Sequence, residues 1–198
     1  MTNTRKALIA AVAMLVLCAA VDIIITARSS RQGAVTKWFD AHSAVTEGWT
    51  SESVTWEDYT NAFNKEISVD GLPGMAFTIE DTEESGPRLI MIKDGAKELL
   101  FEPGWQIDNA YFCDINGDKA PELCITRIVG SGLIDMRIYA MDFKAGKVYE
   151  LSDRGQNDYL LIVKDGRLCV RRQTPMTHET VLEEGQLQLK NGELVIGK

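Results

Sequence analysis

Histidine is scarce in this chain, and its cysteines are not paired in sequence. The 198 residues include only two histidines, His42 and His178, and four cysteines that form no Cys-x-x-Cys motif. A zinc-peptidase helix needs two histidines four positions apart, and a dithiol redox site needs two closely spaced cysteines. The sequence therefore excludes a His-Glu-x-x-His site and indicates no zinc or redox centre.

Basic residues are also fewer than acidic residues. Lys and Arg number 21 against 29 Asp and Glu, which gives a formal net charge of −8. The first 28 residues hold Arg5, Lys6, Arg28 and Asp22, so the rest of the chain carries 18 basic and 28 acidic residues. A surface this acidic repels phosphate backbones, and we expect no nucleic-acid binding.

Recognisable catalytic motifs are missing as well. No Ser, His and Asp stand in a triad-like motif. Gly130-Ser131-Gly132 lacks the Lys-Ser/Thr ending of a phosphate loop, and a hairpin turn or bulge explains it better. The sequence thus predicts a protein without catalysis. The enzymatic alternative is a secreted or anchored hydrolase with a carboxylate-based site.

One long apolar run is present, and it lies near the N-terminus. After Arg5 and Lys6, residues 7–27 contain Asp22 as their only charge. About 21 residues at about 1.5 Å per residue are long enough to span a bilayer. The run predicts a single-pass anchor over residues 1–28 that holds the rest of the chain outside the cytoplasm at the cell membrane. The alternative is secretion after signal cleavage, for which Cys18-Ala19-Ala20 offers small residues.

Two helices are expected after this run. Val35, Trp38, Phe39 and Val45 recur at helical spacing, which predicts a juxtamembrane helix and linker within residues 29–52. A second helix, Trp56–Asn64, is expected after a capping box at its N-terminus. Both would precede the sheets of the main domain.

From Met75 onward the pattern changes to short apolar runs separated by turn dipeptides. Asp94-Gly95, Asp165-Gly166 and Asn191-Gly192 favour tight hairpin turns, because such turns need positive φ. The predicted hairpins pair residues 136–143 with 147–151, 159–163 with 168–172, and 186–189 with 193–196. The sequence therefore predicts that residues 53–198 form a mainly β domain of antiparallel hairpins. A meander, a sandwich or a partial propeller with one or two N-terminal helices is expected, and an α+β fold is the minor alternative.

The most informative stretch is YFCDINGDKAPELCIT, residues 111–126. Asp114, Asn116, Asp118 and Glu122 stand at positions 1, 3, 5 and 9 of a short loop between two apolar runs. Calcium takes six to eight oxygen ligands, and alternate side chains converge when the backbone curls around the ion. We expect these four residues and the carbonyl of Ala120 to bind a structural calcium ion. The alternative is a polar turn closed by Asx-type hydrogen bonds without any ion.

This stretch resembles known calcium loops. Asp114-Ile-Asn-Gly-Asp118 followed by Pro121-Glu122-Leu123 looks like the loops of FG-GAP and VCBS-type repeats. Residues 104–105, 109–124, 130–135 and 145–153 together resemble a longer unit. That unit is the extracytoplasmic β domain attached to beta-lactam-sensor-type membrane metallopeptidases of clostridial bacteria, and the similarity runs from about residue 67 to 173.

The resemblance implies an accessory domain on a membrane tether without the peptidase half. Lys119 stands where the family pattern usually has glycine, and its ammonium group lies near the expected ion. We therefore expect a binding or sensory module that contacts the membrane through its N-terminal segment, with a protein partner or cell-envelope ligand. A purely structural envelope protein is a further alternative.

Two cysteines flank the loop. Cys113 and Cys124 lie on the two strands and are expected to face each other. In an oxidising compartment a disulfide there would contribute on the order of 3 kcal/mol. Two small buried thiols are the equal alternative, because cysteine packs as a small apolar side chain.

Overall fold

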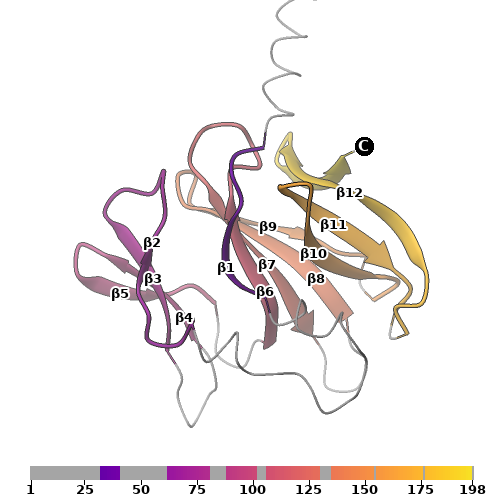
Figure 1. Cartoon of the computed structure of the whole chain (residues 1–198), viewed down its shortest axis with the longest axis horizontal. Helices are drawn as coiled ribbons and strands as arrows, with labels where there is room; N and C mark the ends of the chain where they lie inside the picture. The colour runs from indigo at the N-terminus through magenta and orange to yellow at the C-terminus, as the bar shows by residue number, and fades with distance from the viewer. Residues whose placement is uncertain are drawn as a thin grey trace, which may run out of the picture.

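A computed structural model describes residues 32–40, 62–80, 88–101, 106–129, 135–153, 155–175 and 177–197. The described chain is mainly β and folds into three antiparallel sheets (Figure 1). The sheets follow one another along the chain, and each is built largely from consecutive strands. The mainly β prediction is confirmed.

The central sheet has five strands in the order β1-β6-β7-β8-β9. Their bounds are β1 (Thr36–Asp40), β6 (Gln106–Cys113), β7 (Glu122–Val129), β8 (Asp135–Asp142) and β9 (Lys147–Leu151). All neighbours in this sheet pair antiparallel.

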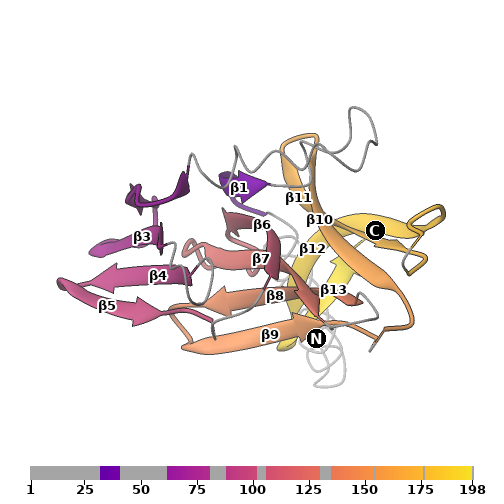
Figure 2. The ribbon, with the colours of Figure 1, turned by 90° about the horizontal axis from the view of Figure 1, so that it is seen from below.

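The other two sheets are four-stranded meanders. The first contains β2 (Ile67–Ser68), β3 (Met75–Glu80), β4 (Arg88–Lys93) and β5 (Ala96–Leu99). The second contains β10 (Asp158–Lys164), β11 (Arg167–Gln173), β12 (Val181–Lys190) and β13 (Glu193–Gly197). Figure 2 shows these meanders on either side of the central sheet.

The central sheet is buried on both faces, because each of the other two sheets shares a core cluster with it. Successive side chains of a strand point to opposite sides, so β6, β7 and β8 each contribute to both clusters. Along β7, Leu123 and Ile125 join one core cluster, which includes Phe77 of β3. Cys124 joins the other cluster, with Leu161 of β10. Two cores divided by one sheet explain why Leu123, Cys124 and Ile125 of β7 are apolar in succession and do not alternate with polar residues.

The predicted hairpins are confirmed, although β12 begins at Val181, ahead of the predicted start at residue 186. Asp94, Asp165 and Asn191 have φ of 51°, 51° and 53°, and each is followed by a glycine with positive φ. These turns join β4 to β5, β10 to β11 and β12 to β13. The fourth hairpin, β8–β9, turns through Gly146 at φ 64°. Local turn chemistry therefore specifies most of the strand order.

The expected first helix is wrong. Residues 36–40 form strand β1, which pairs with β6 at the edge of the central sheet. A register shift between Lys37 and Phe39 lets the consecutive side chains of Trp38 and Phe39 enter the same core. Because of the bulge, two adjacent residues of a strand are both buried, and adjacent buried residues are also typical of the apolar face of a helix. The sequence pattern was therefore wrongly interpreted as a helix.

The second expected helix, Trp56–Asn64, lies almost wholly outside the described residues. Of its last residues, Ala62 is buried and Phe63 forms a parallel bridge with Ile79. Residues 1–28, where the anchor is expected, also lie outside them. Within the described part of the chain, no helix is long and apolar enough to cross a membrane.

Candidate functional site

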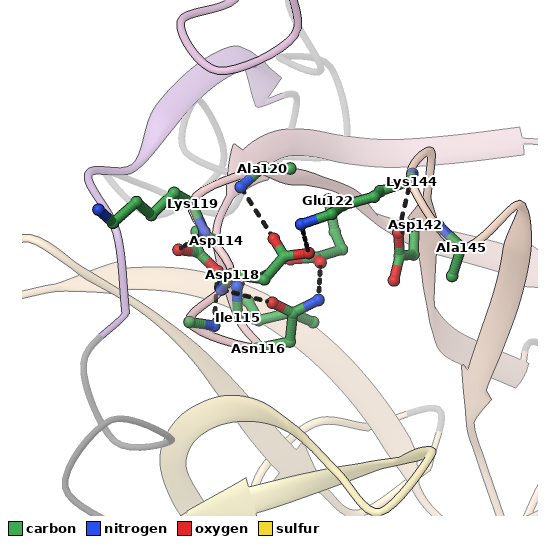
Figure 3. A network of polar contacts seen from close by, with 11 residues as sticks. Asp114, Ile115, Asn116, Asp118, Lys119, Ala120, Glu122, Asp142, Lys144 and Ala145 are labelled. Atoms are coloured by element: carbon green, nitrogen blue, oxygen red, sulfur yellow. Dashed lines mark hydrogen bonds and ion pairs between the residues drawn. The ribbon is translucent and has the colours of Figure 1, made fainter. Parts of the chain in front are cut away.

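The candidate loop connects β6 to β7, and its first residue organises its backbone. Asp114 Oδ1 accepts hydrogen bonds from the amides of Gly117 and Asp118 at 2.6 and 3.1 Å. Its other oxygen accepts from the amide of Lys119 at 2.9 Å. A carboxylate that gathers three N–H groups holds the chain in a tight curl (Figure 3).

Asn116 and Glu122 tie the two ends of the loop together. Asn116 Oδ1 accepts from the amide of Asp118 at 2.8 Å, and its Nδ2 donates to Glu122 Oε1 at 2.5 Å. Glu122 Oε2 accepts from the amide of Ile115 at 2.8 Å. The side chains of Asn116 and Glu122 are thus joined directly, and Asp114 is linked to Asn116 through the amide of Asp118, from which both side chains accept a hydrogen bond. These are hydrogen bonds of the kind expected for the polar-turn alternative.

Asp118 faces the neighbouring β8–β9 turn. Its Oδ1 accepts from the amide of Ala120 at 2.9 Å, and its Oδ2 lies 2.8 Å from the ammonium of Lys144. Asp142, at the end of β8, accepts from the amides of Lys144 and Ala145. Lys144 is therefore positioned by the turn that it belongs to. The sequence analysis missed this cation, because only the pairing of β7 with β8 brings the two turns together.

Glu122 is the buried carboxylate of the site, with 1% of its surface exposed. The pKa of Glu122 is raised to about 8, chiefly by burial and also by the negative charges of Asp142 and Asp114, while the hydrogen bond from the amide of Ile115 opposes the shift. The cause is physical: a carboxylate removed from water and set among other carboxylates favours its neutral form. A cation at this loop would reverse that preference.

The loop residues fit a hard cation by donor chemistry. Asp114, Asn116, Asp118 and Glu122 supply oxygens on one curl, and the ammonium of Lys144 already stands beside one of them as a cation. Among the described residues, no group of three or more His, Cys, Asp or Glu side chains has a metal-holding arrangement. The amide of Ala120, whose carbonyl is the expected fifth ligand, donates to Asp118 Oδ1.

Two residues of the loop have left-handed backbone conformations. Gly117 has φ of 81° and Lys119 has φ of 72°. Lysine thus adopts, at position 119, the conformation that favours glycine, which costs roughly 1 kcal/mol for a residue with a Cβ. The side chain of Lys119 is exposed.

The loop lies where the three sheets and the N-terminal segment meet. The carbonyl of Asp114 accepts from Gly33 at 3.0 Å, and that of Ile115 accepts from Leu189 of β12 at 3.1 Å. Gly71, in the turn before β3, approaches so closely that a Cβ would lie 2.9 Å from the Lys119 carbonyl. The same Cβ would lie 2.7 Å from Pro121 Cδ. A change that fixes the conformation of this loop would therefore also fix the contacts among the three sheets.

The flanking cysteines are free thiols. Cys113 pairs with Glu122 across the hairpin and Cys124 pairs with Tyr111, so the cysteines are diagonal neighbours and not directly opposite. Both are fully buried in the core shared with the β10–β13 sheet. Burial raises the pKa of Cys113 to about 12 and raises that of Cys124 well above its usual value.

A second cluster of carboxylates lies at the opposite end of β6. Asp108 occupies a bulge, between Ile107 and Asn109, and Asn109 pairs with Asp40 of β1. Burial, together with the smaller effect of the charge of Asp40, raises the pKa of Asp108 to about 7. The Tyr111 hydroxyl donates to Asp40. The adjacent polar residues Asp108 and Asn109 inside an apolar strand were the available sequence signal for this cluster.

Comparison with known proteins finds no family model, no curated protein and no solved structure that matches this chain.

Proposed function

We propose that this chain is a membrane-anchored extracytoplasmic binding or sensory accessory module whose β6–β7 loop holds a structural calcium ion. Residues 1–28 anchor it, and it carries out no catalysis. The observation that carries the proposal is the position of the loop, whose backbone bonds to the N-terminal segment and to β12.

Calcium suits this position because the loop concentrates negative charge that the protein neutralises only in part. Asp114, Asp118, Glu122 and Asp142 are neighbours, and Lys144 is the cation paired with Asp118 among the described residues. A bound divalent ion would neutralise Glu122 without protonation and would fix the curl that contacts Gly33 and Gly71. An ion that binds only the folded state stabilises it by mass action.

The test is thermal unfolding of the full chain in detergent, with calcium and with excess chelator. We expect calcium to raise the unfolding midpoint of the wild type and to leave that of Asp118→Ala unchanged. Glu98→Ala, an exposed acidic residue on β5, is the matched control and should respond as the wild type does. The quantity compared is the shift in midpoint that calcium causes in each protein. A mutation that only removes loop hydrogen bonds lowers the midpoint with and without calcium and leaves this shift unchanged. Identical scans for the wild type would remove calcium from the proposal.

The Asp40–Asp108 pair favours a second candidate, a hydrolase with carboxylate chemistry. Two neighbouring carboxylates, one with a pKa raised to about 7, match the requirement for a general acid near neutral pH. A panel of chromogenic glycosides tests this candidate. Turnover by the wild type that is lost in Asp108→Asn and retained in Asp165→Asn would favour the enzyme over the accessory module.

A further inference from the structure

Four of the hairpin connections gather at one end of the molecule, which we call the turn end. It comprises the connections β6–β7, β8–β9, β10–β11 and β12–β13. Lys144 bonds to Asp118 across the first two, and Leu189 of β12 donates to Ile115 of the first. Gln32 donates to the carbonyl of Leu168 and accepts from its amide, which places the start of β11 beside the N-terminal segment.

The described chain begins at this same end. Gln32 also donates to the carbonyl of Leu187, and Gly33 bonds to Asp114, so the entry point is held by several contacts (Figure 1). From Ala27, where the apolar run ends, to Gln32 is five residues, which extend at most about 17 Å. If residues 7–27 span a bilayer, the turn end lies near its surface.

The turn end carries exposed cations at every connection. They are Lys119, Lys144, Lys147, Lys164, Arg167 and Lys190. Lys144 pairs with Asp118 and Lys164 with Glu184, whereas the described residues provide no ion pair for the other four cations.

Several acidic residues at this end are engaged. Asp114, Asp118 and Asp142 accept hydrogen bonds from the amides of their own turns. Asp165 and Glu193 are exposed carboxylates of the hairpin turns, and Asp70 is exposed beside Gly71, which contacts the β6–β7 loop.

The opposite ends of the strands carry Asp40, Asp108, Asp135 and Asp158, of which Asp135 pairs with Arg137 and Asp158 with His178. Two further arginines there are also paired, Arg171 with Glu184 and Arg172 with Glu183. Four cations without an ion pair among the described residues thus lie toward the anchor, whereas Arg137, Arg171 and Arg172 at the opposite ends of their strands are held in ion pairs.

We propose that the turn end docks on the anionic lipid surface of the membrane that holds the chain, through Lys119, Lys147, Arg167 and Lys190. This inference rests on the anchor proposed above. An acidic domain on a short tether is repelled by an anionic bilayer unless it presents its cations, and attraction acts within a Debye length of about 8 Å. Docking therefore fixes the orientation of the domain and turns its acidic end away from the membrane.

The test places the full chain in two kinds of nanodisc. One is made of phosphatidylcholine alone, and in the other about a third of the lipid is the anionic phosphatidylglycerol. Lysine acylation is followed residue by residue by mass spectrometry. Lys65 and Lys97 are internal controls, because Lys65 precedes β2 and Lys97 pairs with Glu80 at the far end of β3.

We expect Lys119, Lys147 and Lys190 to react at least threefold more slowly in the anionic discs, relative to the controls, and salt to abolish the difference. Equal ratios in the two lipids would overturn the docking. If the chain does not remain with the discs, the anchor is wrong. The same footprint is then taken with anionic vesicles, and unchanged lysine rates there would overturn the docking independently.

Discussion

At the scale of single residues, Lys144 is the group that most directly competes with a metal at the loop. Its ammonium lies 2.8 Å from Asp118 Oδ2, and nearby Asp142 and Asp114 also favour its charged form. The pair is largely exposed, so it contributes little to stability by itself. Its position matters more for ion binding, because a fixed positive charge close to a divalent ion opposes it.

We therefore expect Lys144→Gln to lower the calcium concentration at half-saturation several-fold, as measured by titration calorimetry. Lys147→Gln removes an equal charge from the same turn without breaking an ion pair and serves as the control. An equal affinity in both variants would show that Lys144 does not act on the ion.

Asp108 supplies a pH-dependent test at the other end of β6. Its pKa rises from 3.8 to about 7 on folding, chiefly through burial. The folded state therefore holds a proton that the unfolded state loses, and the stability that this group contributes is full below its unfolded pKa. It is lost as the pH rises toward about 7.

Asp108→Asn removes this titration. Relative to the wild type, the variant should gain stability on the order of 4 kcal/mol between about pH 4 and about pH 8, in urea unfolding at each pH. A constant difference between the two proteins across that range would refute the raised pKa.

At the scale of elements, the turn before β3 is joined to the loop by close backbone contact. Gly71 has φ of 91°, and a Cβ there would collide with Pro121 and the Lys119 carbonyl. Gly74 has φ of 75° in the same turn, but a Cβ there would meet nothing within 4 Å. The two glycines thus separate the cost of backbone strain from that of a lost contact.

We expect Gly71→Ala to lower the free energy of unfolding by about 1–3 kcal/mol more than Gly74→Ala in denaturant titrations. The reason is that the loop must move away from the new methyl group. Equal losses would mean that the β2–β3 turn and the loop are not tightly packed.

At the scale of the whole molecule, Cys113 and Cys124 report on the opening of the core between the central sheet and the β10–β13 sheet. Both thiols are fully buried, and the pKa of each is raised. Reaction with a thiol reagent requires the thiolate and access to it. Neither condition is met while the two sheets remain packed.

We therefore expect a thiol reagent to label both cysteines at the same rate, which should equal the rate of global unfolding. Mass spectrometry follows the labelling of each cysteine separately. If the calcium proposal holds, chelator should accelerate both. Rapid labelling of Cys113 in the native protein would show that the loop opens separately from the core, against the junction described above.

Local chemistry alone predicted much of this molecule. Asp94-Gly95, Asp165-Gly166 and Asn191-Gly192 select tight turns because their backbones accept positive φ, and the flanking strands follow from short apolar runs. The residues of the β6–β7 loop were likewise apparent, since Asp114, Asn116, Asp118 and Glu122 are close in sequence and their spacing suffices to bring them together.

Only tertiary structure decided the rest, because the partners are distant in sequence. Trp38 and Phe39 became part of a strand through pairing with β6, about 70 residues away, where a bulge accommodates both in one core. The approach of Lys144 to Asp118 and of Asp40 to Asp108 depends on strand register, which the burial of whole faces sets. The same burial decides that Glu122 is removed from water and that its pKa rises, since no local pattern specifies which face of a strand another sheet will cover.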